Sequence, residues 1–240
     1  MTGILIATLA LLAYSLWVRR DTWSTRWENA ATLALALLAC ALLLMSPWAA
    51  ADIGPVLHDV LGVWNTPALV GHLCLIVAVT ANIYHMLLRL ADPVHVRVIM
   101  RRHLLIPIVL GVAVMVLAYL RSDQTYQRDV LAAPRADGWM LVYFLVGGSL
   151  ALYLSAYSSR LMLALRHDPR AKRTLDLHLV SMTAAIAAGL LVVGSSWVAG
   201  DDASPGIWFC ICVAGGTFAY GSARSWKAKS AWFAPGDRRR

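Results

Sequence analysis

Charged residues are scarce in this sequence of 240 residues. Only 14% of them are Asp, Glu, Lys or Arg, whereas a soluble domain carries about 25%. Hydrophobic residues make up 60% of the chain, and no charged residue stands at the middle of any long apolar run. This composition excludes a soluble globular protein. It also argues against an ion-driven pump or transporter, because these proteins usually place carboxylates inside the membrane.

Cysteine, catalytic motifs and buried lysine are also missing or few. The four cysteines all lie inside apolar runs, so no disulfide framework is expected. Cys210 and Cys212 point to nearly opposite sides of a helix, and no metal site is predicted there. The last apolar run ends before Lys227, which excludes a retinal Schiff base. No nucleotide-binding loop, zinc-protease helix or nucleophile elbow is present, and no catalytic residues or enzyme activity are predicted.

Seven apolar segments have, or nearly have, the roughly 20 residues that a membrane-spanning helix needs. We therefore expect an all-α, polytopic seven-helix bundle in residues 1–222 and a basic, aromatic tail in residues 223–240. The expected spans are 3–18, 30–50, 67–88, 103–120, 139–161, 177–199 and 207–222.

The basic residues predict the orientation. Of the 21 Lys and Arg residues, 18 follow the first, third, fifth and seventh spans, and the other three are Arg121, Arg128 and Arg135. The positive-inside rule then places the N-terminus outside and the C-terminus in the cytoplasm of a bacterial plasma membrane. This distribution explains the net charge of +8 without a nucleic-acid partner. Ser204 and Asp129 should lie outside, and Arg170 inside.

The tail interleaves aromatic and basic residues. Aromatic side chains favour the membrane interface, and each Lys or Arg near an anionic leaflet contributes about 1 kcal/mol to membrane binding. A plain cytoplasmic flank of the last span would show the same pattern. The residues expected to contact anionic lipid are Trp226, Lys227, Lys229, Trp232 and Arg238.

Histidines near both ends of the third span raise the question of haem. His72 and His85 are thirteen positions apart, which places them about 140° apart around a helix. Two haems stacked between the same helices need ligands on one face, so this spacing disfavours them. One haem between His85 and His178 remains an alternative, and the main expectation is that no cofactor is bound.

The third span is the most polar one, and we expect it at the centre of the bundle. Asn82 and His85 share one face, because they are three residues apart. They should face protein, with partners among the serines and tyrosines of spans five and six or His178. His72, beside Gly71 at the outer mouth, is the first candidate to face a ligand, although a hydrogen-bonded interfacial histidine is the simpler interpretation. The candidate ligand-binding residues are His72, Asn82, Tyr84, His85 and His178.

Small residues four positions apart occur in the last three spans, where they let helix backbones approach closely. We therefore expect these spans to form one tight unit. Pro107 should kink the fourth span near its start. The small-residue pairs are Gly147 with Ala151, Ala185 with Gly189, and Gly215 with Ala219.

Two stretches carry a resemblance to a known family. "PALVGHLCLIVAVTANI" and "GWMLVYFLVGGSLALYLSAYSSRLMLALR" resemble the third and fifth spans of an actinobacterial family of seven-span membrane proteins of uncharacterised function. Gly71 and His72 match its glycine–histidine pair, and Trp139, Tyr143 and Phe144 match its aromatic start of the fifth span. The resemblance implies seven spans, and some members carry a transporter label. Members often have a cytoplasmic domain after the last span, where this sequence has only its tail.

Three hypotheses of function follow from these observations. The first is a non-enzymatic module that binds or senses a molecule and acts on a cytoplasmic protein partner or on a second copy of itself. The second is a transporter or facilitator of a small or lipophilic solute, with His72, Asn82 and His85 along the path. The third is a haem-bearing electron carrier.

Overall fold

The chain folds into a bundle of helices, as the sequence predicts. The computed structural model describes residues 2–25, 28–123, 125–132, 137–166, 172–196 and 203–233, with side chains placed as far as Ser230. No strand occurs in these ranges. The α-helices are α1 (Thr2–Val18), α2 (Asn29–Leu44), α3 (Pro47–Asp52), α4 (Gly54–Leu61), α5 (Thr66–Leu90), α6 (Pro93–Ile99), α7 (Ile106–Arg121), α8 (Gly138–Leu165), α9 (Lys172–Gly194) and α10 (Ser204–Phe233). Short 3-10 turns cover Arg20–Thr22 and Val130–Ala132, and a π-helical segment covers Met100–Leu105.

Five helical segments in the described ranges are long and apolar enough to cross a membrane. They are α5, the continuous segment from α6 to α7, α8, α9 and α10, while α1 and α2 are shorter apolar helices of 17 and 16 residues. These helices have the length and composition of a helical membrane protein. Residues 197–199, at the end of the sixth expected span, lie outside the described ranges.

Some helices begin or end away from the limits of the expected spans, most clearly at Ser46 and Ser222. The second expected span, 30–50, is broken, because α2 ends at Leu44 and α3 begins at Pro47. Ser46 is extended, and its hydroxyl accepts a hydrogen bond from the Ala49 amide at 3.3 Å, which starts a new helix. At the other end of the chain, α10 continues past Ser222 to Phe233, so the first part of the expected tail extends the last helix.

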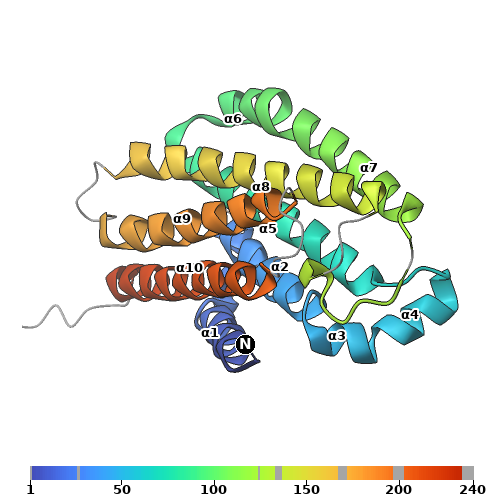
Figure 1. Cartoon of the computed structure of the whole chain (residues 1–240). Helices are drawn as coiled ribbons and strands as arrows, with labels where there is room; N and C mark the ends of the chain where they lie inside the picture. The colour runs from blue at the N-terminus through green and yellow to red at the C-terminus, as the bar shows by residue number, and fades with distance from the viewer. Residues whose placement is uncertain are drawn as a thin grey trace, which may run out of the picture.

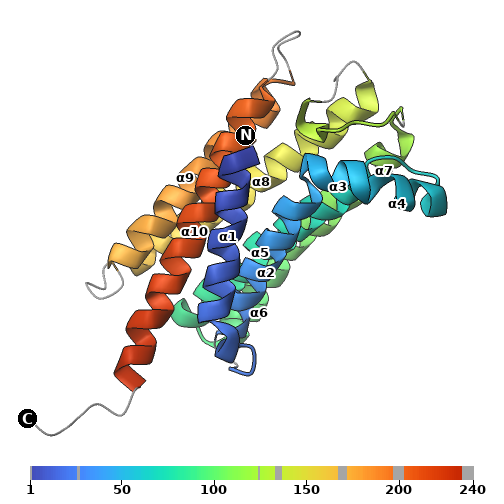
Figure 2. The ribbon, with the colours of Figure 1, turned by 90° about the horizontal axis from the view of Figure 1, so that it is seen from below.

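Helices that are distant in sequence lie side by side in the bundle. Figure 1 shows α10 between α9 and α1, and α7 against α8, while α2 packs along α5. Figure 2 shows that α1 begins and α10 ends at opposite ends of the bundle. We call the end where α1 begins the N-terminal end and the end where α10 finishes the C-terminal end. The short helices α3 and α4 lie at the N-terminal end, and α6 lies at the other.

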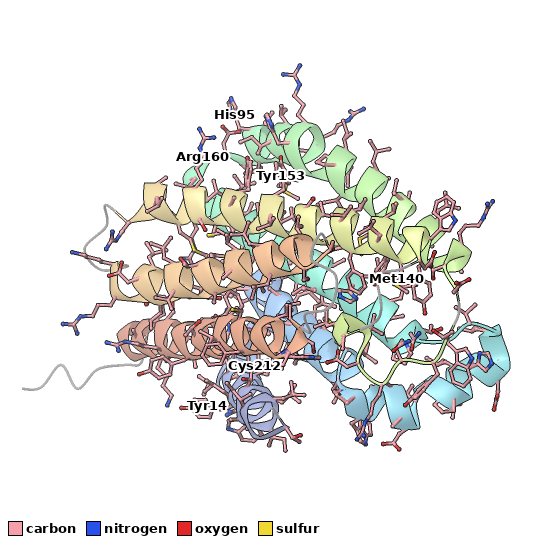
Figure 3. The ribbon with its side chains drawn as sticks, in the orientation of Figure 1. Tyr14, His95, Met140, Tyr153, Arg160 and Cys212 are labelled. Atoms are coloured by element: carbon pink, nitrogen blue, oxygen red, sulfur yellow. The ribbon has the colours of Figure 1, made fainter. Side chains whose placement is uncertain are left out.

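Pro107 disturbs the start of α7, as expected. A proline has no N–H, so the carbonyl of His103, four residues earlier, loses its usual helical partner. The backbone instead forms the π segment Met100–Leu105, and the Tyr153 hydroxyl on α8 donates to the His103 carbonyl at 2.5 Å. Figure 3 shows Tyr153 between α8 and the α6 side of the bundle. A side chain of α8 therefore replaces the missing backbone donor.

Glycines set the closest helix contacts, although not all of them where the sequence suggests. Gly148 and Gly189 meet where α8 crosses α9, because a Cβ on either would lie within 3.6 Å of the other's carbonyl oxygen. Gly147 instead faces Met115 on α7, and Gly215 faces Thr8 and Leu42. The close pair in the fifth expected span therefore uses Gly148 rather than Gly147.

Gly71 places the start of α5 directly against α2. A Cβ on Gly71 would lie 2.6 Å from Met45 Cγ and 3.0 Å from the Ala41 carbonyl oxygen. Only glycine fits this contact without a shift of the α2 backbone. The contact also fixes the height and rotation of the next residue, His72.

We predict that Gly71→Ala destabilises the protein by about 1–3 kcal/mol, because it overpacks a backbone contact. Gly3→Ala is the control, since a Cβ on Gly3 meets nothing within 4 Å. Thermal unfolding in a mild detergent measures both variants. Equal melting temperatures for wild type and Gly71→Ala would contradict the assigned crossing of α2 and α5.

Candidate functional site

An apolar cavity of about 130 Å³ lies inside the bundle between α2, α5, α8, α9 and α10. About half of the residues in its wall are methionine, alanine or glycine, and the alanines and glycines leave space that larger side chains would fill. Examples are Met45, Met115, Met182, Gly147 and Ala185. Polar side chains reach it only in a few places, chiefly His72 and Tyr143 toward the N-terminal end and Asn82 toward the C-terminal end.

His72 and Tyr143 form a hydrogen-bonded pair in the cavity wall. His72 Nδ1 lies 2.8 Å from the Ala68 carbonyl oxygen and 2.9 Å from the Tyr143 hydroxyl. A carbonyl oxygen only accepts, so we assign the proton to Nδ1, which shares it between the two oxygens. The Tyr143 hydroxyl then accepts from His72 and keeps its own proton to donate. His72 Nε2 is the accepting nitrogen of the ring.

Aromatic packing holds Tyr143 in place. Its ring meets Phe144 edge to face at 5.3 Å and Tyr119 at 5.7 Å between centroids. The Tyr119 hydroxyl donates in turn to the Trp64 carbonyl, just before α5. Tyr143 is 1% exposed and Phe144 2%, so neither ring has room to turn. The donor at this end of the cavity is therefore held in one position.

Asn82 stands at the other end of the cavity. Its Nδ2 donates to the Ser158 hydroxyl on α8 at 3.3 Å, as the sequence analysis expected of a serine of the fifth span. Ser181 on α9 donates to the Ala214 carbonyl at 2.8 Å and ties α9 to α10. These bonds satisfy polar groups that hydrocarbon would leave without partners.

A second, smaller chamber of about 60 Å³ lies beyond Asn82, toward the C-terminal end. Asn82 and Phe218 line both spaces and so separate them. Unlike the apolar cavity, this inner chamber is lined by charged and imidazole groups, which come from Arg19, Glu28, Arg89, His85 and His178. His178 Nδ1 donates to the Thr174 carbonyl at 2.7 Å, and its Nε2 accepts from the Ser222 hydroxyl at 3.4 Å.

One carboxylate beside the inner chamber is shared by three cations. Glu28 stands at the residue before α2 begins. Its carboxylate forms ion pairs with Arg19 at 2.8 Å, Lys229 at 2.6 Å and Arg89 at 3.3 Å. Arg19 also donates to the Thr32 hydroxyl at 3.2 Å and lies over the Trp226 ring. The cluster joins the α1–α2 connection to the ends of α5 and α10. We call these four charged residues the Glu28 cluster.

The electrostatics of the Glu28 cluster favour the charged form of the acid. Burial alone would raise the pKa of Glu28, but the hydrogen bonds from Lys229 and Arg19 outweigh it and hold that pKa at about 2. Burial also lowers the pKa of the Arg19 guanidinium, and its bond to Glu28 opposes this. The guanidinium remains charged at neutral pH, because its ordinary pKa lies far above this range.

The structure brings most of the expected site residues together. Asn82 is 6% and His85 8% exposed, so both face protein as predicted, and His72 and His178 line the two spaces. Tyr84 does not join them, because it is 40% exposed and lines neither space. Tyr84 lies between Asn82 and His85 in sequence, but successive residues point in different directions around a helix, and Tyr84 points outward from α5.

The residues expected on the lipid surface divide into two groups. Lys229 and Trp226 turn inward to Glu28 and Arg19, so the bundle and not lipid supplies these contacts. Exposed Lys227 donates to the hydroxyl of Tyr14 on α1 at 2.5 Å, and Figure 3 labels Tyr14. The side chain of Trp232 and the whole of Arg238 lie outside the described residues.

Sequence reasoning missed the Glu28 cluster. Arg19, Glu28 and Arg89 fall in connections with many basic residues, and the positive-inside rule accounts for such residues without any site. The one available signal is that Glu28 directly precedes a long apolar run, where an acid gains from the helix N-terminus. His95, by contrast, is exposed on α6 and pairs with Asp92, as expected of a solvated residue (Figure 3).

The geometry does not suit a haem between His85 and His178. Both line the inner chamber, but its volume of about 60 Å³ is far below the roughly 300 Å³ at which pockets for drug-sized ligands begin. The two bonds of the His178 ring also occupy both its nitrogens. Within the described residues, no three His, Cys, Asp or Glu side chains are grouped to hold a metal ion.

We predict that Glu28 makes stability depend on pH in the acid range. Its pKa falls from 4.5 to about 2 on folding, so its contribution is complete above pH 4.5 and is lost as the pH falls to about 2. The shift corresponds to about 3 kcal/mol. Thermal unfolding in detergent between these pH values measures it.

Glu28→Gln should remove this pH dependence and cost about 3–5 kcal/mol at neutral pH, because it leaves three cations without their carboxylate. Asp21→Asn is the control, since the Asp21 side chain is 76% exposed. If the stability of Glu28→Gln changes with pH in the same way as that of the wild type, the Glu28 cluster is not the source of the pH dependence.

Comparisons with protein-family models, with curated proteins and with solved structures find no match to this chain. The proposals below are therefore built on the two internal spaces and the side chains that line them.

Proposed function

We propose that this chain is an integral membrane protein that binds a small, mostly apolar molecule bearing one hydrogen-bonding group. The observation that carries the proposal is the apolar cavity of about 130 Å³. Engineered apolar cavities of about 150 Å³ stay dry and bind benzene or xenon. A molecule of about one ring, or a short branched chain, matches this size.

The His72–Tyr143 pair would recognise the polar group of the ligand. With the proton of His72 on Nδ1, the Tyr143 hydroxyl offers a donor and His72 Nε2 an acceptor. A hydroxyl or carbonyl on the ligand would satisfy the Tyr143 donor. A site that hydrogen-bonds such a group rejects an analogue that lacks it, because a buried polar group then loses its partner.

The cavity wall supports binding without chemical conversion. Its polar groups are an imidazole, a phenol, an amide and the hydroxyls of Ser155 and Ser181, and it contains no carboxylate or cysteine thiol. The charged Glu28 cluster lies beside the other chamber. General acid–base or nucleophilic chemistry would need an activated group within reach of the ligand.

The link between the two spaces supports a sensing role. Asn82 touches the ligand cavity on one side and the inner chamber on the other, and its bond to Ser158 connects α5 to α8. A ligand that moves Asn82 would bias the Glu28 cluster, which ties four segments together. The readout would be the basic surface at the C-terminal end, acting on a cytoplasmic protein or on a second copy of the chain.

We further propose seven spans in a bacterial plasma membrane, with the N-terminus outside, for a member of the actinobacterial family named above. The 18-to-3 distribution of basic residues supports this orientation, and the start of α1 and the end of α10 at opposite ends of the bundle fit an odd number of spans. The tail would lie near anionic lipid. Cysteine placed at Ser204 should be labelled from outside whole cells and cysteine at Arg170 should not; the reverse pattern would invert the orientation.

A facilitator is the second candidate. The observation in its favour is the order of the spaces along the bundle, with the apolar cavity followed by Asn82 and the polar chamber. A solute could pass if Asn82 and Phe218 moved apart. Ligand flux into liposomes that contain the purified protein would favour transport, whereas binding without flux favours sensing.

We predict that the purified wild type retains its ligand, and that Ala185→Phe does not. Ala185 lines the cavity, so a ring at this position fills the space of the ligand. Mass spectrometry of organic extracts should find about one small apolar molecule per wild-type chain. Ala113→Phe is the matched control, because Ala113 is exposed on α7. The same molecule retained in equal amount by Ala185→Phe would contradict binding in this cavity.

A further inference from the structure

The inner chamber carries more positive charge than its own residues neutralise. Three cations of the Glu28 cluster share one carboxylate, which leaves a formal excess of 3 − 1 = +2. Arg19 is fully engaged, since its side chain is 3% exposed and bonds Glu28 Oε2. Arg89 and Lys229 both use the other oxygen, Oε1, and their side chains are 41% and 32% exposed. The excess charge therefore sits on Arg89, which lines the chamber, and on Lys229, which does not line it but bonds the same oxygen of Glu28.

His85 provides an independent sign that a partner is absent. The residue lines the chamber and is 8% exposed, yet its Nδ1 has no hydrogen-bond partner among the described residues. A buried polar nitrogen without a partner costs about 1–3 kcal/mol, so proteins rarely keep one without a use for it. Arg89 stands one helical turn after His85 on α5 and extends from the same face.

We propose that the inner chamber binds a phosphate group, with Arg89 and Lys229 as charged donors and His85 as the buried donor. The hydroxyl of Ser225, which also lines the chamber, adds a neutral donor. A volume of about 60 Å³ exceeds several times the roughly 10–15 Å³ that one water requires, and so suits a group of phosphate size rather than a ring system.

The chemistry favours phosphate over a simple halide. Phosphate has several acceptor oxygens, and it can accept from the planar fork of an arginine and from an ammonium at the same time. The phosphate could belong to the headgroup of an anionic lipid or to a soluble phosphate. The partial exposure of Arg89 and Lys229 at the end of the bundle suits either source. The site does not depend on the apolar cavity or on its ligand.

Two measurements on the full-length protein in neutral detergent separate the sources. Native mass spectrometry compares binding of phosphatidic acid and phosphatidylcholine, and thermal unfolding compares inorganic phosphate with chloride at equal ionic strength. Preference for phosphatidic acid alone assigns a lipid headgroup, whereas stabilisation by inorganic phosphate assigns a soluble phosphate. No preference in either measurement overturns the proposal.

The variants Arg89→Gln and Lys229→Gln test the assigned donors. Each variant should lower the affinity for the preferred phosphate ligand by at least about fivefold, which is the effect of one basic residue near an anionic surface. Arg101→Gln is the control, since Arg101 is an exposed arginine of the π segment, and it should change binding by less than about twofold. Equal weakening by Arg101→Gln would reduce the effect to general surface charge and overturn the site. If both variants fail to fold, the wild-type comparison of phosphate with chloride and of the two lipids decides alone.

Discussion

Hydrocarbon offers no hydrogen bonds, and this constraint governs every polar side chain inside the bundle. An unsatisfied group in such surroundings costs several kcal/mol, so each one must find a partner within the protein. Tyr153 completes the backbone that Pro107 interrupts, and Asn82 reaches Ser158 on the neighbouring helix. The groups that depart from this rule then become informative. Among the described residues these are Ser15 Oγ, His58 Nδ1 and His85 Nδ1, of which only His85 lines an internal space. Together with the donor proton of Tyr143, it marks where we propose that a molecule from outside binds.

The same packing that closes the bundle leaves it hollow. Gly148 and Gly189 let α8 and α9 touch, and Gly71 does so for α5 and α2, while Ala185, Gly147 and their neighbours lack the volume to fill the centre. Methionines complete the wall, and their flexible side chains tolerate ligands of different shape. The small residues of these helices therefore both allow the close helix contacts and leave the ligand cavity open. The polar cluster at the C-terminal end closes the bundle where the apolar packing stops.

Much of the fold could be predicted from the sequence, because apolar length alone identifies membrane-spanning helices. That Asn82 and His85 share one buried face also followed from residue spacing, and the partner found for Asn82, a serine of α8, is among those expected. The direction of Tyr84 did not, because lipid and protein interior are both apolar, and the pattern therefore does not show which side of a helix is buried. The break at Ser46 was missed, although a serine followed by a proline is a common start of a new helix.

The Glu28 cluster shows the main limit of sequence reasoning here. Its members are separated by up to 210 positions, from Arg19 to Lys229, and basic residues at helix ends have a sufficient explanation in membrane topology. Only the fold shows that three of them meet one acid. Tyr143 is similar, because its value as a donor depends on how His72 meets Ala68 one turn before it.

The most direct test of the central claim compares benzene with phenol as probes of the cavity. Thermal unfolding in detergent measures stabilisation, and a ligand at a hundred times its dissociation constant adds about 2.7 kcal/mol. The account predicts that both probes stabilise the wild type, phenol more strongly at equal concentration, and that Tyr143→Phe reduces the effect of phenol to that of benzene. Absence of stabilisation by either probe, or a preference for phenol that Tyr143→Phe leaves intact, would contradict it.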